Sequence, residues 1–190
     1  MKKLLFVAVL AFASMMVYAG PRAIGGRLGA FSGVSYEHAF GDSNMLEIEA
    51  GFSIDGRLDR WWNESSVSHH DHGWGRTVQA AVTYDWIDPF GAKFPWEHKG
   101  EWHWYLGVGG AGGFGWNFWN SYDSYRRNWG FAAAAGRAGV EYDFWFPLQL
   151  SIDFRPTLGV GIVDNVYNDS SKAGLYWEMT CLALGVRYKF

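Results

Sequence analysis

The carboxyl-terminal stretch of the chain, residues 176–190, alternates between two kinds of side chain. Every second position is apolar or hydroxyl-bearing: Thr180, Leu182, Leu184, Val186, Tyr188 and Phe190. The positions between them hold small or charged residues: Cys181, Ala183, Gly185, Arg187 and Lys189. A period of two predicts a β-strand whose two faces meet different surroundings. An apolar face toward lipid and a polar face toward a filled lumen are typical of a transmembrane β-barrel strand.

The amino-terminal stretch has the pattern of a secretory signal peptide. Lys2 and Lys3 precede an apolar core at residues 4–13, and Val17-Tyr18-Ala19 fits a cleavage site. A membrane anchor is the alternative, but this core is too short to span a bilayer as a helix. We therefore expect residues 1–19 to be a cleaved signal peptide and residues 20–190 to form the exported domain.

The composition leaves strands as the only elements that could cross a membrane. Mean hydropathy is −0.13, and no apolar run after residue 19 approaches the roughly 18 residues that a spanning helix needs. Aromatic residues make up 19% of the chain and include 12 Trp, an excess that aromatic girdles at the two bilayer interfaces would explain. The formal charge of −3 becomes more negative without Lys2 and Lys3, which argues against a nucleic-acid partner.

Alternation and turn composition together predict eight strands. They are expected at residues 23–30, 34–40, 45–55, 76–87, 101–115, 129–144, 148–162 and 176–190. Long polar loops at residues 56–75, 116–128 and 163–174 alternate with shorter links, which predicts long extracellular loops and short periplasmic turns. A single strand over residues 23–40 is the alternative, but it would give an odd number. The predicted fold is all-β: an eight-stranded antiparallel transmembrane β-barrel with up-and-down meander order.

The same alternation assigns a set of charged residues to the lumen. The inward positions are Arg27, Glu37, Glu47, Glu49, Asp85, Arg137, Glu141, Asp153, Arg155, Arg187 and Lys189. An eight-stranded barrel is just wide enough for its own side chains, and a buried charge is far less costly when it is paired. We therefore predict a structural plug of salt bridges rather than a catalytic site. The single cysteine, Cys181, is expected to be a buried thiol in the lumen.

Several strands in this order resemble the small OmpA-like outer-membrane barrels, particularly uncharacterised barrel proteins of Bacteroidetes. The matching stretches are residues 23–29, 45–52, 104–115, 136–144, 147–156 and 184–190. An aromatic residue at the end of the last strand also resembles the signal that the barrel assembly machinery binds. The resemblance implies a bacterial outer-membrane location, with lipid and lipopolysaccharide around the barrel, and it supplies no catalytic residues and no cofactor.

One loop carries side chains suited to metal binding. His69, His70 and His72 flank Asp71, and imidazole and carboxylate groups are good ligands for Zn²⁺ or Cu²⁺. Adjacent residues on a loop do not preset a tetrahedral site, so a solvated loop tip is the favoured interpretation. We expect no metal centre, with these histidines as the weak candidates.

A lipid hydrolase needs a serine beside a histidine, and no such pair is evident. Ser35 and His38 are predicted on opposite faces of one strand, while Ser151 and His103 face the lumen. We therefore expect a non-enzymatic protein with a structural or surface-interaction role. Its extracellular loops contain aromatic residues at 61–62, 116–119 and 129 and the arginines 126 and 127, which suit recognition of an unidentified partner. A small, low-conductance diffusion pore is the alternative.

Overall fold

The structure is a computed structural model that describes residues 19–29, 31–53, 74–89, 99–119, 127–165, 170–179 and 182–190. These residues form ten strand segments: β1 (Ala19–Gly29), β2 (Ser32–Phe40), β3 (Asn44–Ser53), β4 (Trp74–Ile87), β5 (Gly100–Trp119), β6 (Arg127–Phe144), β7 (Gln149–Phe154), β8 (Thr157–Asn165), β9 (Ser170–Glu178) and β10 (Leu182–Lys189). Within these ranges, no helix is long and apolar enough to span a membrane.

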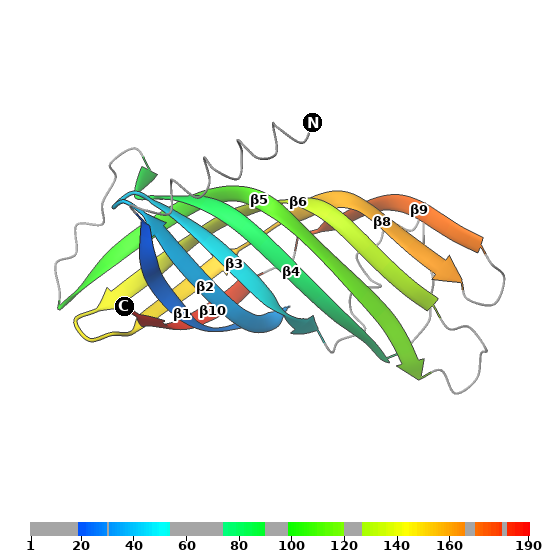
Figure 1. Ribbon diagram of the computed structural model, residues 1–190, viewed down its shortest axis with the longest axis horizontal. Coiled ribbons are helices and arrows are strands. Elements are labelled where there is room, and N and C mark those ends of the chain that lie inside the picture. The colour runs from blue at the N-terminus through cyan, green and yellow to red at the C-terminus, as the bar shows by residue number, and fades with distance from the viewer. Residues whose placement is uncertain are drawn as a thin grey trace.

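The ten segments make a closed barrel of eight antiparallel strands in up-and-down order, as predicted. Segments β7 and β8 pair with β6 in one continuous register, so they are two halves of one strand. Segments β9 and β10 pair with β8 and β7, so they form the last strand, with a one-residue shift in register between its two halves. Antiparallel pairing of β10 with β1 closes the barrel (Figure 1).

Two expectations about strand continuity were wrong. The strand predicted over residues 148–162 is interrupted at Arg155 and Pro156, because proline has no N–H to donate to a ladder. Pro156 still accepts a hydrogen bond from the Gly136 amide at 2.9 Å, which keeps the neighbouring strand in register. The strand predicted over residues 176–190 begins earlier, at Ser170, and its two halves are separate segments. The predicted break between the first two strands is confirmed, since β1 ends at Gly29 and β2 begins at Ser32.

The strands are strongly staggered around the barrel. Each residue of a regular strand has a paired residue on the neighbouring strand. Tracing these pairs from Arg27 across β2, β3, β4, β5 and β6 leads to Gly161 on β8. Tracing the pairs from Arg27 in the other direction, across β10, leads to Ser151 on β7. These two positions lie ten residues apart on one strand, and such a stagger requires the strands to tilt relative to the barrel axis.

The barrel has two different ends. One end, here called the terminus end, carries the start of β1, the end of β10 and the links at residues 41–43, 88–99 and 145–148. The opposite end, here called the loop end, carries the connections that follow β1, β3, β5 and β8. At the loop end β5, β6, β8 and β9 extend beyond β1, β2 and β3 (Figure 1).

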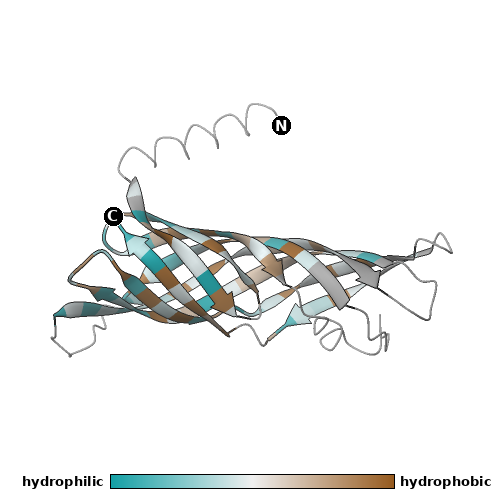
Figure 2. Cartoon of the chain, turned by 90° about the horizontal axis from the view of Figure 1, so that it is seen from below, coloured by the Kyte–Doolittle hydropathy of each residue, from teal (hydrophilic) through white to brown (hydrophobic). Residues whose placement is uncertain are grey.

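The barrel is apolar outside and polar inside. Outward side chains such as Leu28, Ile152 and Leu184 are 64%, 58% and 55% exposed. Alternate positions on the same strands are buried and mostly polar or charged, so hydrophobic and hydrophilic bands alternate along the strands (Figure 2). This distribution of side chains is the reverse of that in a soluble protein, and it is the distribution expected for a barrel in lipid.

Aromatic side chains surround the terminus end on the outer face. The set is Tyr36, His38, Phe40, Tyr84, Trp86, Trp102, Tyr142, Phe144, Trp145, Phe146, Tyr188 and Phe190. Neighbouring rings contact one another, as Trp102 and Tyr142 do with centroids 4.8 Å apart. Amphipathic rings are favourable at the headgroup level of a bilayer, so this girdle marks one membrane interface.

Candidate functional site: the charged lumen

Arg137 lies at the centre of the lumen and contacts residues of β3, β4 and β5. It projects inward from β6, and its side chain is fully buried. Its Nη1 donates to Asp85 Oδ2 at 2.7 Å, and its Nε lies 3.0 Å from Glu47 Oε2. The guanidinium also stands 4.3 Å above the Tyr105 ring and donates from Nη2 to the Tyr105 hydroxyl at 3.1 Å. One cation therefore links β3, β4, β5 and β6 across the interior.

Arg187, from β10, holds the opposite side of Glu47. Its Nη2 donates to Glu47 Oε1 at 2.7 Å, so this carboxylate lies between two guanidinium groups. The remaining donors of Arg187 reach Ser35 Oγ at 2.9 Å and Ser151 Oγ at 2.7 Å. Its Nη1 also lies 3.3 Å from Glu37 Oε1. A buried ion pair stabilises only when its other donors and acceptors are satisfied, and these hydroxyls serve that purpose.

A second group of ion pairs lies beside the first. Arg27 pairs with Glu49 and with Asp153, which brings β1, β3 and β7 together. Arg155 Nη1 also contacts Glu49 Oε2, at 2.6 Å. Glu49 is therefore shared by two arginines, as Glu47 is, and the two shared carboxylates lie on the same face of β3.

Arg22 belongs to the network, although the alternation did not predict it. Its Nη1 donates to Glu37 Oε2 at 2.9 Å, and its guanidinium also pairs with Glu141. Strict alternation would place Arg22 on the lipid face with Ile24. The β1–β2 register shifts between Pro21 and Ala23, and this bulge leaves Arg22 as an extra residue that turns inward. Pro21 was the available signal, because proline within a strand often marks a bulge.

The structure brings the predicted lumen residues together. The nine residues of the predicted salt-bridge network are all buried, with at most 4% of each residue exposed: Arg27, Glu37, Glu47, Glu49, Arg137, Glu141, Asp153, Arg155 and Arg187. Asp85 is also buried, whereas Lys189 is partly exposed and donates to Asp143 Oδ2 at 2.7 Å. Positive and negative side chains from opposite walls thus meet in the middle of the barrel.

Glycines give these large side chains room. An added Cβ at Gly107 would fall on the Asp85 carboxylate, and one at Gly139 would lie 2.5 Å from the Tyr105 ring and hydroxyl. Both glycines are on strands adjacent to the side chain that covers them. Gly107 and Gly139 therefore serve the packing of the lumen.

Aromatic rings fill the lumen on the loop-end side of the ion pairs. Phe131 lies between Trp129 and Tyr176, with ring centroids 6.0 Å and 4.1 Å away. Alanines at 81, 111 and 135 complete this buried cluster. Trp129 was expected in an outer recognition surface, and that expectation was wrong, because its ring stacks inward on Phe131 and covers Gly115.

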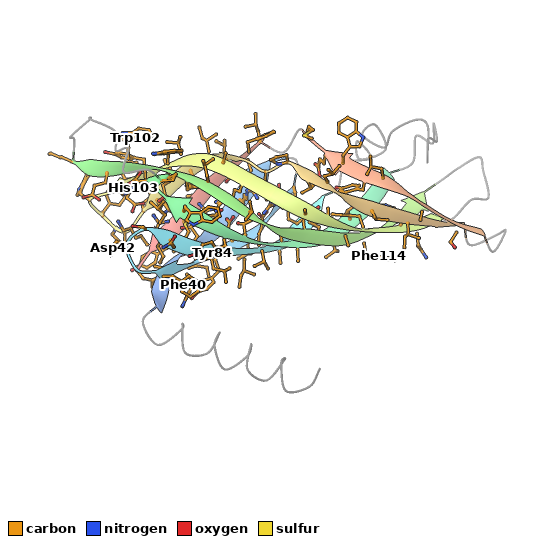
Figure 3. All side chains as sticks on the ribbon, turned by 90° about the horizontal axis from the view of Figure 1, so that it is seen from above. Phe40, Asp42, Tyr84, Trp102, His103 and Phe114 are labelled. Carbon is orange, nitrogen blue, oxygen red and sulfur yellow. The ribbon has the colours of Figure 1, made fainter. Side chains whose placement is uncertain are left out.

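The rim of the terminus end carries a separate group of polar side chains. His103 Nδ1 lies 2.7 Å from Asp88 Oδ2, and the Trp104 amide donates to the other oxygen of that carboxylate at 3.2 Å. His103 and Asp88 line a cavity of about 1240 Å³ that opens at this end. Asp42 and His103 lie together at this end, far from Phe114 (Figure 3).

The serines and histidines considered for a hydrolase have other contacts. Ser35 and Ser151 both bind Arg187, His38 Nδ1 lies 2.9 Å from the Tyr36 hydroxyl, and His103 pairs with Asp88. No group of three or more metal-binding side chains occurs in the part of the chain that the structure describes. The candidates His69, His70 and His72, the loop aromatics at 61–62, Arg126 and Cys181 lie outside those residues.

Comparison with known proteins supports the fold. No family model matches the chain, and no curated protein sequence matches it significantly. The chain is similar in structure to a major outer membrane protein from Thermus thermophilus, with a TM-score of 0.52 and 13% sequence identity. The match covers 90% of this chain and 99% of the other. The two proteins share a β-barrel architecture.

Proposed function

We propose that this protein is a non-enzymatic, integral outer-membrane β-barrel whose lumen is closed by ion pairs. Its role would be structural or would consist of surface interactions made by the loop-end connections between β3 and β4, β5 and β6, and β8 and β9. The observation that carries the proposal is the sharing of Glu47 by Arg137 and Arg187, at 3.0 Å and 2.7 Å, across the middle of the barrel. Side chains bound in this way leave the interior of so narrow a barrel filled.

The proposal includes an export route and an orientation. Residues 1–19 would be removed as a signal peptide, the terminus end would face the periplasm, and the loop end would face outward. This is the arrangement of the small OmpA-like barrels of Gram-negative bacteria, which the strand sequences resemble. The aromatic girdle and the apolar wall would contact lipid and lipopolysaccharide, and the last strand would bind the barrel assembly machinery.

Single-channel recording tests the proposal. The mature chain would be refolded in detergent, its folding verified by different mobility of boiled and unboiled samples, and the barrel inserted into a planar bilayer. We expect no steady openings, because ions would have to displace charged groups that are already paired. Reproducible openings would overturn the closed-lumen proposal and favour the alternative, a small diffusion pore whose selectivity the lumen charges set.

A further inference from the structure

The cavity at the terminus end is a vestibule whose mainly apolar wall also carries several charged and polar side chains. It is bounded by Arg22 of β1, the turn at residues 41–43, Asp88, and the inward side chains of β5, β6 and β10. Its volume of about 1240 Å³ exceeds the roughly 300–1,000 Å³ typical of small-molecule sites. Arg22, which pairs with Glu37 and Glu141, is the lining residue through which the vestibule adjoins the ion pairs of the lumen.

The vestibule carries more negative than positive charge. Four of its lining residues are acidic: Asp42, Asp88, Glu101 and Asp143. Arg22, Lys189 and His103 oppose them. Arg22 pairs with Glu37 and Glu141, which lie outside the lining, while His103 contacts Asp88 and Glu101. A concave, low-dielectric site lined by one sign of charge concentrates counter-ions of the opposite sign. The vestibule therefore favours a cation.

One buried acceptor in this wall lacks a donor. Asp143 is only 5% exposed, and its Oδ2 accepts a hydrogen bond from Lys189 Nζ at 2.7 Å. Its Oδ1 is buried and has no hydrogen-bond partner among the residues described. Buried carboxylate oxygens are almost always satisfied, and one left without a donor is costly. Lys189 is partly exposed, with 37% of its side chain accessible, so it can move to admit a second donor.

We propose that the vestibule binds a primary ammonium group that donates to Asp143 Oδ1. An ammonium group supplies three hydrogen-bond donors in a compact charge, so one donor can reach Asp143 while another reaches Glu101, the register partner of Asp143 on β5. A hard metal ion needs six or more oxygen ligands, and the described residues offer no such group. The ammonium group can come from a free aliphatic diamine or from a lysine-type side chain of a peptide, since both present the same chemistry.

Isothermal titration of the refolded barrel tests the proposal, with cadaverine and a short peptide containing one lysine as probes. We expect saturable binding of cadaverine to the wild type and binding at least about tenfold weaker to Asp143→Asn, the cost of losing one charged hydrogen bond. Lys189→Met should bind cadaverine more tightly, because it removes the cation that competes for the same carboxylate. If cadaverine binds and the peptide does not, the vestibule accepts only a free amine. If the peptide binds as well, the vestibule also accepts a lysine side chain.

Glu178→Gln is the matched control, because it removes a buried carboxylate at the other end of the lumen. It should bind cadaverine as the wild type does. Choline, which has no N–H donor, should bind at least about tenfold more weakly than cadaverine. The proposal is overturned if the folded wild type shows no saturable binding, if Asp143→Asn binds equally well, or if choline matches cadaverine. Should Asp143→Asn fail to fold, unchanged affinity in Lys189→Met overturns it. These outcomes do not depend on whether the lumen conducts.

Discussion

Arg137 of β6 and Glu47 of β3 face each other across the lumen, with 3.0 Å between Nε and Oε2. The two strands are not neighbours in the barrel, because β4 and β5 lie between them. The pair therefore connects opposite walls directly, and a buried pair of this kind costs much more when one partner is removed than when both are.

Replacing Arg137 by Leu should destabilise the barrel by about 3–5 kcal/mol, because Asp85 would keep a buried charge without its cation and Glu47 would keep only Arg187. The measurement is the urea midpoint of the refolded barrel in detergent. Arg155→Leu should have a smaller effect in the same direction, because its partner Glu49 would still be paired with Arg27. An unchanged midpoint in both variants would contradict the structural role of the ion pairs.

Replacing Gly139 by Ala should destabilise the barrel by about 1–3 kcal/mol through overpacking. The added Cβ would lie 2.5 Å from the Tyr105 ring, which the cation of Arg137 holds in place. Gly110→Ala is the matched control, because its nearest neighbour would be 3.7 Å away and the site faces outward. Equal unfolding midpoints for the two variants would show that the lumen adapts freely at Gly139.

Replacing Phe131 by Ala should cost about 3 kcal/mol, since the change leaves a cavity between Trp129 and Tyr176. Phe114 lies on the same end of the barrel but is 51% exposed on the outer face, so Phe114→Ala should cost far less. Thermal unfolding followed by far-UV circular dichroism compares the two. A larger decrease in unfolding temperature for Phe114→Ala than for Phe131→Ala would mean that the rings inside the lumen contribute little to stability.

The alternation of side chains predicts which residues enter the lumen wherever a strand is regular. A period of two sends every second side chain of such a strand to the inside, and Arg27, Glu47 and Arg187 are buried at those positions. The alternation did not predict that Arg22 enters the lumen, because a bulge at Pro21 reverses the alternation locally. The interruption at Pro156 could have been predicted, since proline removes a ladder donor.

The pairing of the lumen charges was not predictable in the same way. Which carboxylate meets which guanidinium depends on the stagger between strands that are far apart in the sequence, and alternation carries no information about stagger. The positions of the large side chains opposite Gly107 and Gly139 depend on the same quantity. Trp129 lies at the start of the predicted strand and has the same inward parity as Arg137, so the alternation already placed it in the lumen, and its assignment to a loop surface disregarded that pattern.

The most direct test of the closed lumen is a double-mutant cycle on Arg137 and Glu47. The free energy of unfolding would be measured for the wild type, Arg137→Leu, Glu47→Leu and the double variant, all refolded in the same detergent. If the two side chains form a buried pair, the double variant should be more stable than the sum of the single losses by at least about 1 kcal/mol. Losses that add to within about 0.5 kcal/mol would contradict the pairing across the lumen and the closed barrel that depends on it.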